Sequence, residues 1–392
     1  MSKPLAIAIC VASRLVATRA AYSMAREYSG STFFDRWNFI DTPDLLNNGD
    51  VQYQSRANAS TQNLISVNGA GNAILKVDNV TNVPFDIKRN SVRIESSESY
   101  GIGSIFMIDL LHLPFGCSVW PSFWTRGTGT GKWPDVGEID IIEGVNMRTF
   151  NQMALHTSPG CVQASGAQQS GRTTQPDCAK DEGRPGCTVQ ETKKGSYGAD
   201  FAPMGGGVYA AQFDEAGVYI WFWSRADVPA SIKGDSAKTT MDTADWGPPS
   251  AAWPASSCNV AQHFTPQQII LQITLCGDFA TPTYNDTCPP PKNSCTQDNV
   301  FGPGSPTYDN AFFEIPWLRV YSANPATGVT NATSVAPPGS TATPGSSSGA
   351  SPSNTPGSGG NGSNGAERLL SLSFGSTLLT GFAGLALLMA FL

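Results

Sequence analysis

The sequence predicts an all-β protein, folded as a two-sheet β-sandwich of the jelly-roll type. Of its 392 residues, 40 are glycine and 28 are proline, and only 14% are charged. This composition suits many short strands joined by turns and disfavours a bundle of long helices. Short apolar runs recur between turn residues, and none continues with a helical period. Because a sandwich often exceeds about 200 residues as one unit, we expect a single large domain.

Seven apolar runs of strand length are expected to form the two sheets. In chain order they span residues 104–111, 137–143, 153–156, 208–213, 218–223, 269–275 and 317–321. The run at 218–223 is apolar or aromatic at every position, which indicates a strand covered on both faces. Core packing is therefore the preferred interpretation of Trp221 and Trp223, ahead of sugar contact. His112, within an apolar stretch, is also expected to be structural.

The charge balance bears on the kind of partner. The chain has a net charge of −7 and contains no block of Lys or Arg. Phosphate backbones and anionic bilayers attract basic clusters, so this balance argues against a nucleic-acid partner and against binding to an anionic membrane surface. A neutral polysaccharide fits better, and we expect no cofactor.

The cysteines and sequons indicate the secretory route. Cys10 lies in the N-terminal apolar stretch, and the other eight cysteines lie in the body of the chain at 117, 161, 178, 187, 258, 276, 288 and 295. An even set predicts disulfides, although the sequence leaves their pairing open. Their spacing lacks a tight Cys-x-x-Cys pair, so we expect no metal site. Asn-x-Ser/Thr sequons begin at residues 58, 79, 285, 331 and 361 and agree with secretion.

The N-terminal 24 residues resemble a signal peptide. Lys3 precedes an apolar stretch at residues 4–12, as in the charged start and apolar middle of such a signal. Arg14 and Arg19 interrupt the pattern, and no clear small-residue cleavage site precedes Tyr22. The folded domain is expected to span residues 25–323.

The C-terminal part of the chain divides into a stalk and a processing signal. Residues 324–363 are rich in Ser, Thr, Pro and Gly and cannot bury enough apolar surface to fold, which predicts an extended stalk. Residues 364–392 combine small residues, a spacer and an apolar tail, the layout of a glycosylphosphatidylinositol (GPI) signal with Asn364 as the expected attachment residue. The alternative is a tail anchor, although a spanning helix needs about 20 apolar residues. Either way, we expect a secreted protein held at the cell surface.

Three acids lie close together in an apolar, strand-like run, where charged residues are normally excluded. They are Glu138, Asp140 and Glu143. Side chains alternate along a strand, so Glu143 would point away from the other two unless one extra residue is inserted. We therefore predict a β-bulge at residues 141–142, which would place all three acids on one face. Two carboxyls about 5 Å apart suit glycoside hydrolysis with retention, whereas the alternative is an exposed acidic strand edge.

Aromatic residues surround the acids in the sequence and predict a substrate cleft on the sandwich. Trp120 and Trp124 precede the acidic run, Trp133 lies just before it, and His156 follows it. Flat aromatic faces bury the C–H surfaces of pyranose rings, so tryptophan beside carboxylates favours a sugar-binding cleft. Burial in the core is the alternative for the tryptophans.

Three segments together resemble the fungal laminarinase branch of glycoside hydrolase family 16. They are Trp-Pro-Ser-Phe-Trp at 120–124, Gly-Glu-Ile-Asp-Ile-Ile-Glu-Gly-Val-Asn at 137–146, and residues 155–161. Further matches at 205–210, 276–278 and 313–321 extend the resemblance over about residues 28–321. The resemblance implies a jelly roll, retaining chemistry, Glu138 as nucleophile, Glu143 as general acid/base and Asp140 as their electrostatic helper. It also implies substrate contacts from Trp120, Trp124, Trp133, Asn146, His156 and Phe279, where Phe279 stands at a position that is usually tryptophan.

The bulged spacing of the acids is that of laminarinases, whereas Glu-x-Asp-x-Glu is typical of lichenases and wall-remodelling transglycosylases. The resemblance therefore implies endo-acting hydrolysis of β-1,3-glucan and mixed β-1,3/1,4-glucan. We also expect a monomer. Two alternatives stay open. One is a transglycosylase that passes the glycosyl group to another glucan, and the other is a glucan-binding protein without catalysis.

Overall fold

A computed structural model describes residues 22–181, 184–234, 238–290 and 292–332. Residues 1–21 of the predicted signal-like segment (1–24), most of the predicted stalk and the whole predicted GPI signal with Asn364 lie outside the described residues, so the processing expected there stays a prediction. The expected domain bounds of 25 and 323 are too narrow, because Tyr22–Ser29 and Val329–Asn331 both form strands that pair with the large sheets.

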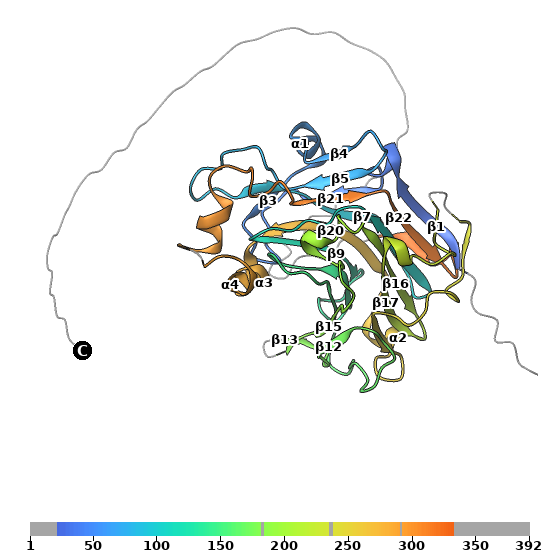
Figure 1. Ribbon diagram of the computed structural model, residues 1–392. Coiled ribbons are helices and arrows are strands. Elements are labelled where there is room, and N and C mark those ends of the chain that lie inside the picture. The colour runs from blue at the N-terminus through green and yellow to red at the C-terminus, as the bar shows by residue number, and fades with distance from the viewer. Residues whose placement is uncertain (1–21, 182–183, 235–237, 291, 333–392) are drawn as a thin grey trace, which may run out of the picture. The chain divides into compact units, whose positions relative to one another are not determined.

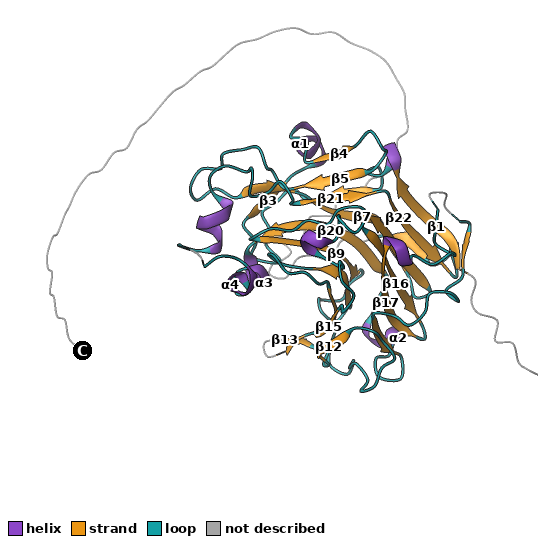
Figure 2. Cartoon of the chain, in the orientation of Figure 1, coloured by secondary structure: helices purple, strands orange, loops and turns teal. Residues whose placement is uncertain are grey.

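Two large antiparallel sheets dominate the described part of the chain (Figure 2). The seven-stranded sheet has the order β18 (Thr240–Met241), β1 (Tyr22–Ser29), β22 (Trp317–Ser322), β8 (Ser104–Leu110), β16 (Gly207–Asp214), β17 (Gly217–Ser224), β19 (Ala251–Pro254). The nine-stranded sheet has the order β12 (Arg172–Gln175), β15 (Cys187–Gln190), β11 (Gln152–His156), β10 (Glu138–Glu143), β9 (Val119–Gly127), β20 (Gln267–Leu275), β7 (Arg93–Tyr100), β2 (Trp37–Phe39), and β23 (Val329–Asn331) also pairs with β7. The predicted all-β fold is confirmed, and each of the seven predicted runs forms a strand.

Smaller elements lie around the two sheets (Figure 1). A three-stranded sheet joins β21 (Phe312–Ile315), β5 (Ala73–Lys76) and β4 (Ile65–Val67), and strand pairs join β3 (Val51–Tyr53) to β6 (Arg89–Ser91) and β13 (Lys180–Asp181) to β14 (Arg184–Pro185). The helices are single short segments: α1 (Arg56–Thr61), α2 (Val260–His263), α3 (Gly277–Ala280), α4 (Tyr284–Thr287), η1 (Gly30–Thr32), η2 (Gly198–Asp200), η3 (Arg225–Asp227) and η4 (Thr296–Val300). Among the described residues no helix is long and apolar enough to cross a membrane.

The main hydrophobic core is built from alternate residues of both large sheets. On β8, Phe106 and Ile108 belong to this core, whereas Ile105 and Met107 belong to a second cluster, as the two-residue period of a strand requires. The second cluster contains four tryptophans, at 221, 223, 246 and 317. Trp221 and Trp223 are therefore packing residues, as expected.

Two central strands, β7 and β9, were not predicted from the sequence. β7 reads Arg-Ile-Glu-Ser-Ser-Glu-Ser-Tyr and β9 reads Val-Trp-Pro-Ser-Phe-Trp-Thr-Arg-Gly, and neither is a continuous apolar run. Nearly every residue of both strands is nonetheless buried. Glu95 of β7 forms ion contacts with Arg93 of the same strand and with Arg126 of β9. Other polar side chains of the two strands bind elsewhere: Glu98 binds Arg26 of β1, and Thr125 binds Gln267 of β20.

The eight body cysteines form four disulfides in the described part of the chain. They are Cys117–Cys288, Cys161–Cys258, Cys178–Cys187 and Cys276–Cys295. The prediction of disulfides is confirmed, and the structure supplies the pairing that the sequence left open. Three of the four bridges end on cysteines next to strands of the nine-stranded sheet or within it, namely Cys187 in β15, Cys276 directly after β20 and Cys117 shortly before β9.

Candidate active site

A cleft of about 510 Å³ lies on the face of the nine-stranded sheet that points away from the main core. Its lining comes from β9, β10, β11, β13, β14, β15 and β20, together with the segment before β3, the loop before β10 and the helix α3. All three acids line it, and so do Trp120, Trp124, Trp133, His156 and Phe279. The sequence-predicted residues are thus gathered in one place, with one exception described below.

The predicted β-bulge lies in the middle of β10. Against β9, Asp140 is opposite Trp124 and Ile142 is opposite Phe123, so Ile141 is the extra residue. Against β11, Asp140 is opposite Ala154 and Glu143 is opposite Gln152. The insertion turns the side chains of Ile141 and Ile142 into the main core and returns Glu143 to the cleft face. The bulge prediction is confirmed.

An indole N–H holds each of the two glutamates. Trp133 Nε1 donates to Glu138 Oε2 at 2.8 Å, and Trp120 Nε1 donates to Glu143 Oε1 at 3.0 Å. Gln152 Nε2 donates to the other oxygen of Glu143 at 3.1 Å. Because the donors come from neighbouring strands and from the loop before β10, they fix the rotation of both carboxyl groups. The sequence analysis treated the tryptophans as stacking residues and missed this second role.

His156 lies beside the other end of the acidic group. Its Nε2 atom lies 3.1 Å from Asp140 Oδ2 and 3.7 Å from Glu138 Oε1. Potential ligand atoms of Glu138, Asp140 and His156 lie within 4.8 Å of one another, so these residues can in principle hold a metal ion. Such an ion would be bound by the carboxyls of Glu138 and Asp140, which face the cleft. The expectation of a metal-free site stays a prediction.

Burial of the three carboxyls changes their protonation. Loss of solvent, and secondarily the charge of Asp140, raises the pKa of Glu138 from 4.5 to about 8. Burial and the charge of Glu143 raise the pKa of Asp140 well above its usual value, and burial also raises the pKa of Glu143. His156 and the indole of Trp133 act in the opposite direction on Glu138. The acids therefore share fewer than three negative charges near neutral pH.

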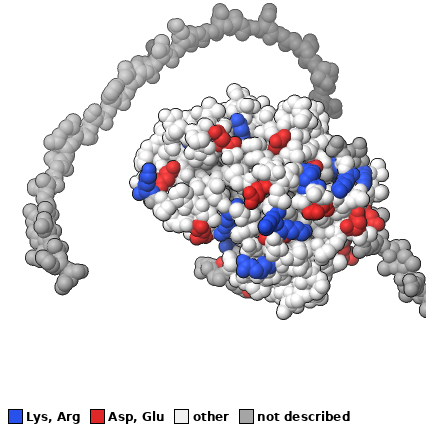
Figure 3. All heavy atoms as spheres, in the orientation of Figure 1, with Lys and Arg blue, Asp and Glu red and all other residues white. Residues whose placement is uncertain are grey.

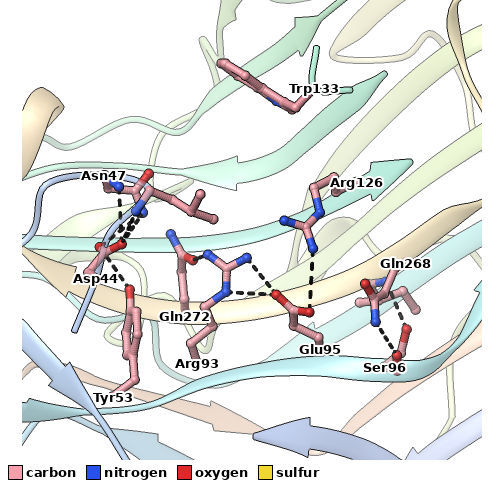
Figure 4. A network of polar contacts seen from close by, with 12 residues as sticks. Asp44, Asn47, Tyr53, Arg93, Glu95, Ser96, Arg126, Trp133, Gln268 and Gln272 are labelled. Carbon is pink, nitrogen blue, oxygen red and sulfur yellow. Dashed lines mark hydrogen bonds and ion pairs between the residues drawn. The ribbon is translucent and has the colours of Figure 1, made fainter. Parts of the chain in front are cut away.

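A buried ion-pair network supports the cleft floor (Figure 4). Arg93 Nη2 donates to Glu95 Oε1 at 2.7 Å, and Arg126 Nη2 lies 3.6 Å from Glu95 Oε2. Arg93 Nη1 donates to Gln272 Oε1 at 2.8 Å, and its guanidinium lies 5.2 Å from the ring centroid of Trp124. The two guanidiniums share the carboxylate of Glu95, which offsets part of the penalty of burying these charges. Arg126, Gln272 and Trp124 are consequently held in fixed positions along the cleft.

A second group of polar contacts fixes the segment that closes one side of the cleft. Asp44 accepts hydrogen bonds from the backbone of Leu46 and Asn47 and from the side chains of Asn47 and Tyr53 (Figure 4). Leu46 and Asn47 line the cleft. The sequence analysis missed these residues, because nothing in the order of an Asp, an Asn and a distant Tyr shows that a strand pair will bring them together.

Other cleft residues were missed although their positions could have been inferred. Ser122 and Arg126 lie two residues to either side of Trp124, so they share its face of β9. Gln152 and Gln272 occupy the cleft face of strands whose apolar residues had been recognised. The two-residue period of a strand could have identified these residues, once Trp124 had been placed in a cleft.

Phe279 lies at the end of the cleft nearest Glu143. Its ring meets that of Trp120 edge to face at 5.6 Å, and the guanidinium of Arg148 lies 4.9 Å from its ring centroid. Phe279 is partly exposed and lines the cleft. The structure thus gives Phe279 a face toward the cleft and a fixed orientation.

Asn146 requires a correction, because it does not line the cleft. Its side chain is fully buried, accepts a hydrogen bond from the Ser118 backbone N–H at 2.9 Å and donates to the Ala280 carbonyl at 2.9 Å. Its backbone has a φ of 57°, a left-handed conformation that asparagine tolerates better than most residues. Asn146 is a structural turn residue, and its amide has no atom left for a substrate in the direction of the acids.

Paired carboxyls on one strand, oriented by indoles in an aromatic cleft on a jelly roll, define a glycoside hydrolase. The family model described as "XgeA-like, catalytic GH16 domain" matches residues 37–321 of this chain. The chain belongs to glycoside hydrolase family 16.

Two relatives and two solved structures illustrate this membership. A probable glycosidase of Schizosaccharomyces pombe is 36% identical over 76% of this chain and 69% of its own length, and the endo-1,3(4)-beta-glucanase xgeA of Emericella nidulans is 36% identical over 76% of this chain. The chain spans only 47% of the length of the latter. Laminarinase 16A of Phanerochaete chrysosporium is 34% identical with a TM-score of 0.70, and an elongating family 16 beta-1,3-glucosyltransferase is 37% identical with a TM-score of 0.69. Each alignment covers 77% of this chain and 100% of the solved one.

The buried acid Glu138 predicts a pH-dependent stability. The folded protein holds this proton more tightly than the unfolded chain, so the free energy of unfolding should fall as the pH rises from about 4.5 toward about 8. Glu138→Gln removes a carboxyl that becomes charged in the buried site as the pH approaches 8, and with it the loss of stability that this charge causes. We expect the variant to unfold at a higher temperature than the wild type at pH 8, and at nearly the same temperature at pH 5. Thermal unfolding followed by circular dichroism measures both, and an equal loss of stability in the two proteins would contradict the burial of a protonated Glu138.

Proposed function

We propose that the chain is an endo-acting retaining hydrolase of β-1,3-glucan and mixed β-1,3/1,4-glucan that works by double displacement. The observation that carries the proposal is the bulge in β10, which brings Glu138 and Glu143 to the same face of one strand with Asp140 between them. Neighbouring carboxyls on one strand are suited to the close spacing of a retaining mechanism.

In the proposed first step, the ionised carboxylate of Glu138 attacks the anomeric carbon and forms a glycosyl ester. Glu143 gives its proton to the departing glycosidic oxygen, so the leaving sugar departs as a neutral alcohol. The indole N–H of Trp133 stabilises the charged form of Glu138. Burial is the larger cause of the raised pKa of Glu138 and the charge of Asp140 the second, so a proton kept on Asp140 removes the second cause and favours ionisation of Glu138.

In the second step Glu143, now ionised, takes a proton from a water molecule. The water oxygen bonds to the anomeric carbon, the ester bond to Glu138 breaks, and both acids return to their starting states. The hydrogen bonds from Trp120 and Gln152 stabilise the ionised form of Glu143 that this step requires.

The substrate class is supported by the relatives and by the charge distribution. Laminarinase 16A is described with 6-O-glucosyl-laminaritriose in its donor and acceptor sites, and the E. nidulans relative is named an endo-1,3(4)-beta-glucanase. Figure 3 shows positive and negative side chains interspersed on the visible face among larger areas of other residues, which suits a neutral partner better than a charged one. Trp120, Trp124 and Trp133 offer ring surface for pyranose units on both sides of the acids.

A second candidate, transfer of the glycosyl group to another glucan, is favoured by the likeness to the elongating glucosyltransferase. Products from laminarin, analysed with and without an acceptor oligosaccharide, separate the two. Chains longer than the substrate would identify transfer, and only shorter chains would identify hydrolysis.

The assignment of roles predicts opposite behaviour of two variants. Glu138→Gln should lose nearly all turnover, because an amide cannot form the glycosyl ester. Glu143→Ala should lose roughly 100- to 10,000-fold on glucan but recover with azide on an aryl glycoside, since only the acid/base is missing. Glu314→Gln, at a glutamate on β21 bonded to Asn68 and Asn72, is the matched control and should keep full activity. Azide rescue of a Glu138 variant, with inverted product, would exchange the two roles.

We propose that Phe279 stacks on a sugar ring beyond Glu143. A smaller ring than tryptophan buries less pyranose surface, and at about 25 cal/mol per Å² the difference is on the order of 1 kcal/mol. Phe279→Trp should therefore lower KM on long β-1,3-glucan about fivefold with little change in kcat, and Phe279→Ala should raise KM. Steady-state kinetics on chains of several lengths test this. If neither variant changes KM, Phe279 does not contact the substrate.

We propose that the enzyme is a secreted monomer held at the cell surface by a GPI anchor on Asn364. The four disulfides support an oxidising compartment. A phosphatidylinositol-specific phospholipase should release the protein from cells, and light scattering should then give the mass of one chain. Recovery of the intact C-terminal peptide by mass spectrometry would rule out the anchor.

A further inference from the structure

Asn151, directly before β11, binds both sides of the bulge in β10. Its Oδ1 atom accepts a hydrogen bond from the Glu143 backbone N–H at 3.0 Å, and its Nδ2 atom donates to the Ile141 carbonyl at 2.9 Å. The Asn151 side chain is fully buried and does not line the cleft. It therefore acts on the protein and not on the substrate.

The bulge creates the need for this contact. A residue that is added to one strand interrupts the ladder, so backbone groups on the side facing the partner strand lose their usual partners. In β10 the interruption falls between Asp140 and Glu143 on the side of β11. A buried backbone N–H or carbonyl must be paired. The amide of Asn151 carries one acceptor and one donor in a fixed plane, and it satisfies one group on each side of Ile142.

Asn151 is itself held from two directions. Its backbone N–H donates to Ser196 Oγ at 3.2 Å, and its carbonyl accepts from the Glu191 N–H at 2.9 Å. The next residue, Gln152, donates to the carboxylate of Glu143. Two consecutive residues, Asn151 and Gln152, thus fix Glu143. Asn151 binds the backbone N–H of Glu143, and Gln152 binds the carboxylate of Glu143.

We propose that Asn151 is a positioning residue for the acid/base, because it sets the bulge that aims Glu143 at the glycosidic oxygen. This inference rests on the proposed function and deepens it. The bonds of the Asn151 side chain go to the backbone of Ile141 and Glu143, so we expect its effect on the reaction to pass through the bulge and the position of Glu143. A residue needed only for folding would affect all substrates equally.

The test compares Asn151→Ala on two substrates of different leaving-group ability. On laminarin, where the leaving sugar needs a proton, we expect kcat to fall about 100-fold, the loss typical of a misplaced catalytic group. On a dinitrophenyl laminaribioside, whose leaving group needs no proton, release of the phenol should be nearly unchanged in the first turnover. Azide should accelerate the later turnovers, as predicted for Glu143→Ala. Asn299→Ala, which removes a buried amide bonded to Tyr284 and Cys295, is the control and should show neither the substrate difference nor the azide effect.

A double variant separates this inference from the proposed function. If Asn151 acts through Glu143, adding Asn151→Ala to Glu143→Ala should cause little further loss, whereas independent roles would multiply the two losses. Absence of azide rescue in Glu143→Ala itself would overturn the proposed roles. Rescue in Glu143→Ala, together with an equal loss on both substrates in Asn151→Ala, would overturn the inference about Asn151 alone.

Asn151→Asp keeps the test available if the alanine variant does not fold. Its side chain retains the oxygen that accepts from the Glu143 N–H but lacks the donor to the Ile141 carbonyl. We expect the same substrate difference at a smaller size, with azide acceleration. A folded Asn151→Asp variant that loses activity equally on the two substrates would contradict the proposal.

Discussion

The site depends on a single extra residue in a central strand. If β10 kept its sequence but were a regular strand without the bulge, Glu138 and Asp140 would face the cleft and Glu143 would face the core, where a charged carboxyl has no partner. With the insertion, isoleucines 139, 141 and 142 all enter the main core. The apolar residues therefore enforce the geometry of the acids, because a slip of one residue would expose isoleucine and bury glutamate.

The same placement sets the electrostatics of the cleft. Three carboxyls on the face of one strand are too close and too buried to ionise independently, so the protein must distribute protons among them. The neighbouring donors are asymmetric: Glu138 has an indole and His156 beside it, whereas Glu143 has an indole and the Gln152 amide. An acid/base and a nucleophile need different protonation states, and this asymmetry gives each carboxyl a distinct environment.

The sequence predicted the parts of the fold in which apolar pattern and structure agree. All seven apolar runs are strands, and the spacing of the acids predicted the bulge, because only an inserted residue could bring Glu143 to the face of Glu138. It did not predict β7 and β9, whose cleft faces carry Arg93, Glu95 and Arg126 in place of apolar residues. The sequence analysis also placed Asn146 in the cleft, because the family motif contains it. The structure gives another reason for an asparagine at this position: its backbone is in the left-handed region, and its side chain binds the Ser118 backbone.

The failure to predict β7 and β9 has a cause that also explains how the site is built. A strand next to a polar cleft loses its apolar alternation on one face, so the strands that matter most for binding are the hardest to recognise. The polar groups on that face cannot be identified singly, since Arg93, Glu95 and Gln272 are tolerated under the cleft only as a mutually bonded set from separate strands. Asn151 belongs to the same class: its importance follows from a gap in the ladder of another strand. Local sequence can show that a bulge is needed, but the residue that stabilises the bulge is found only when the paired strand is in place.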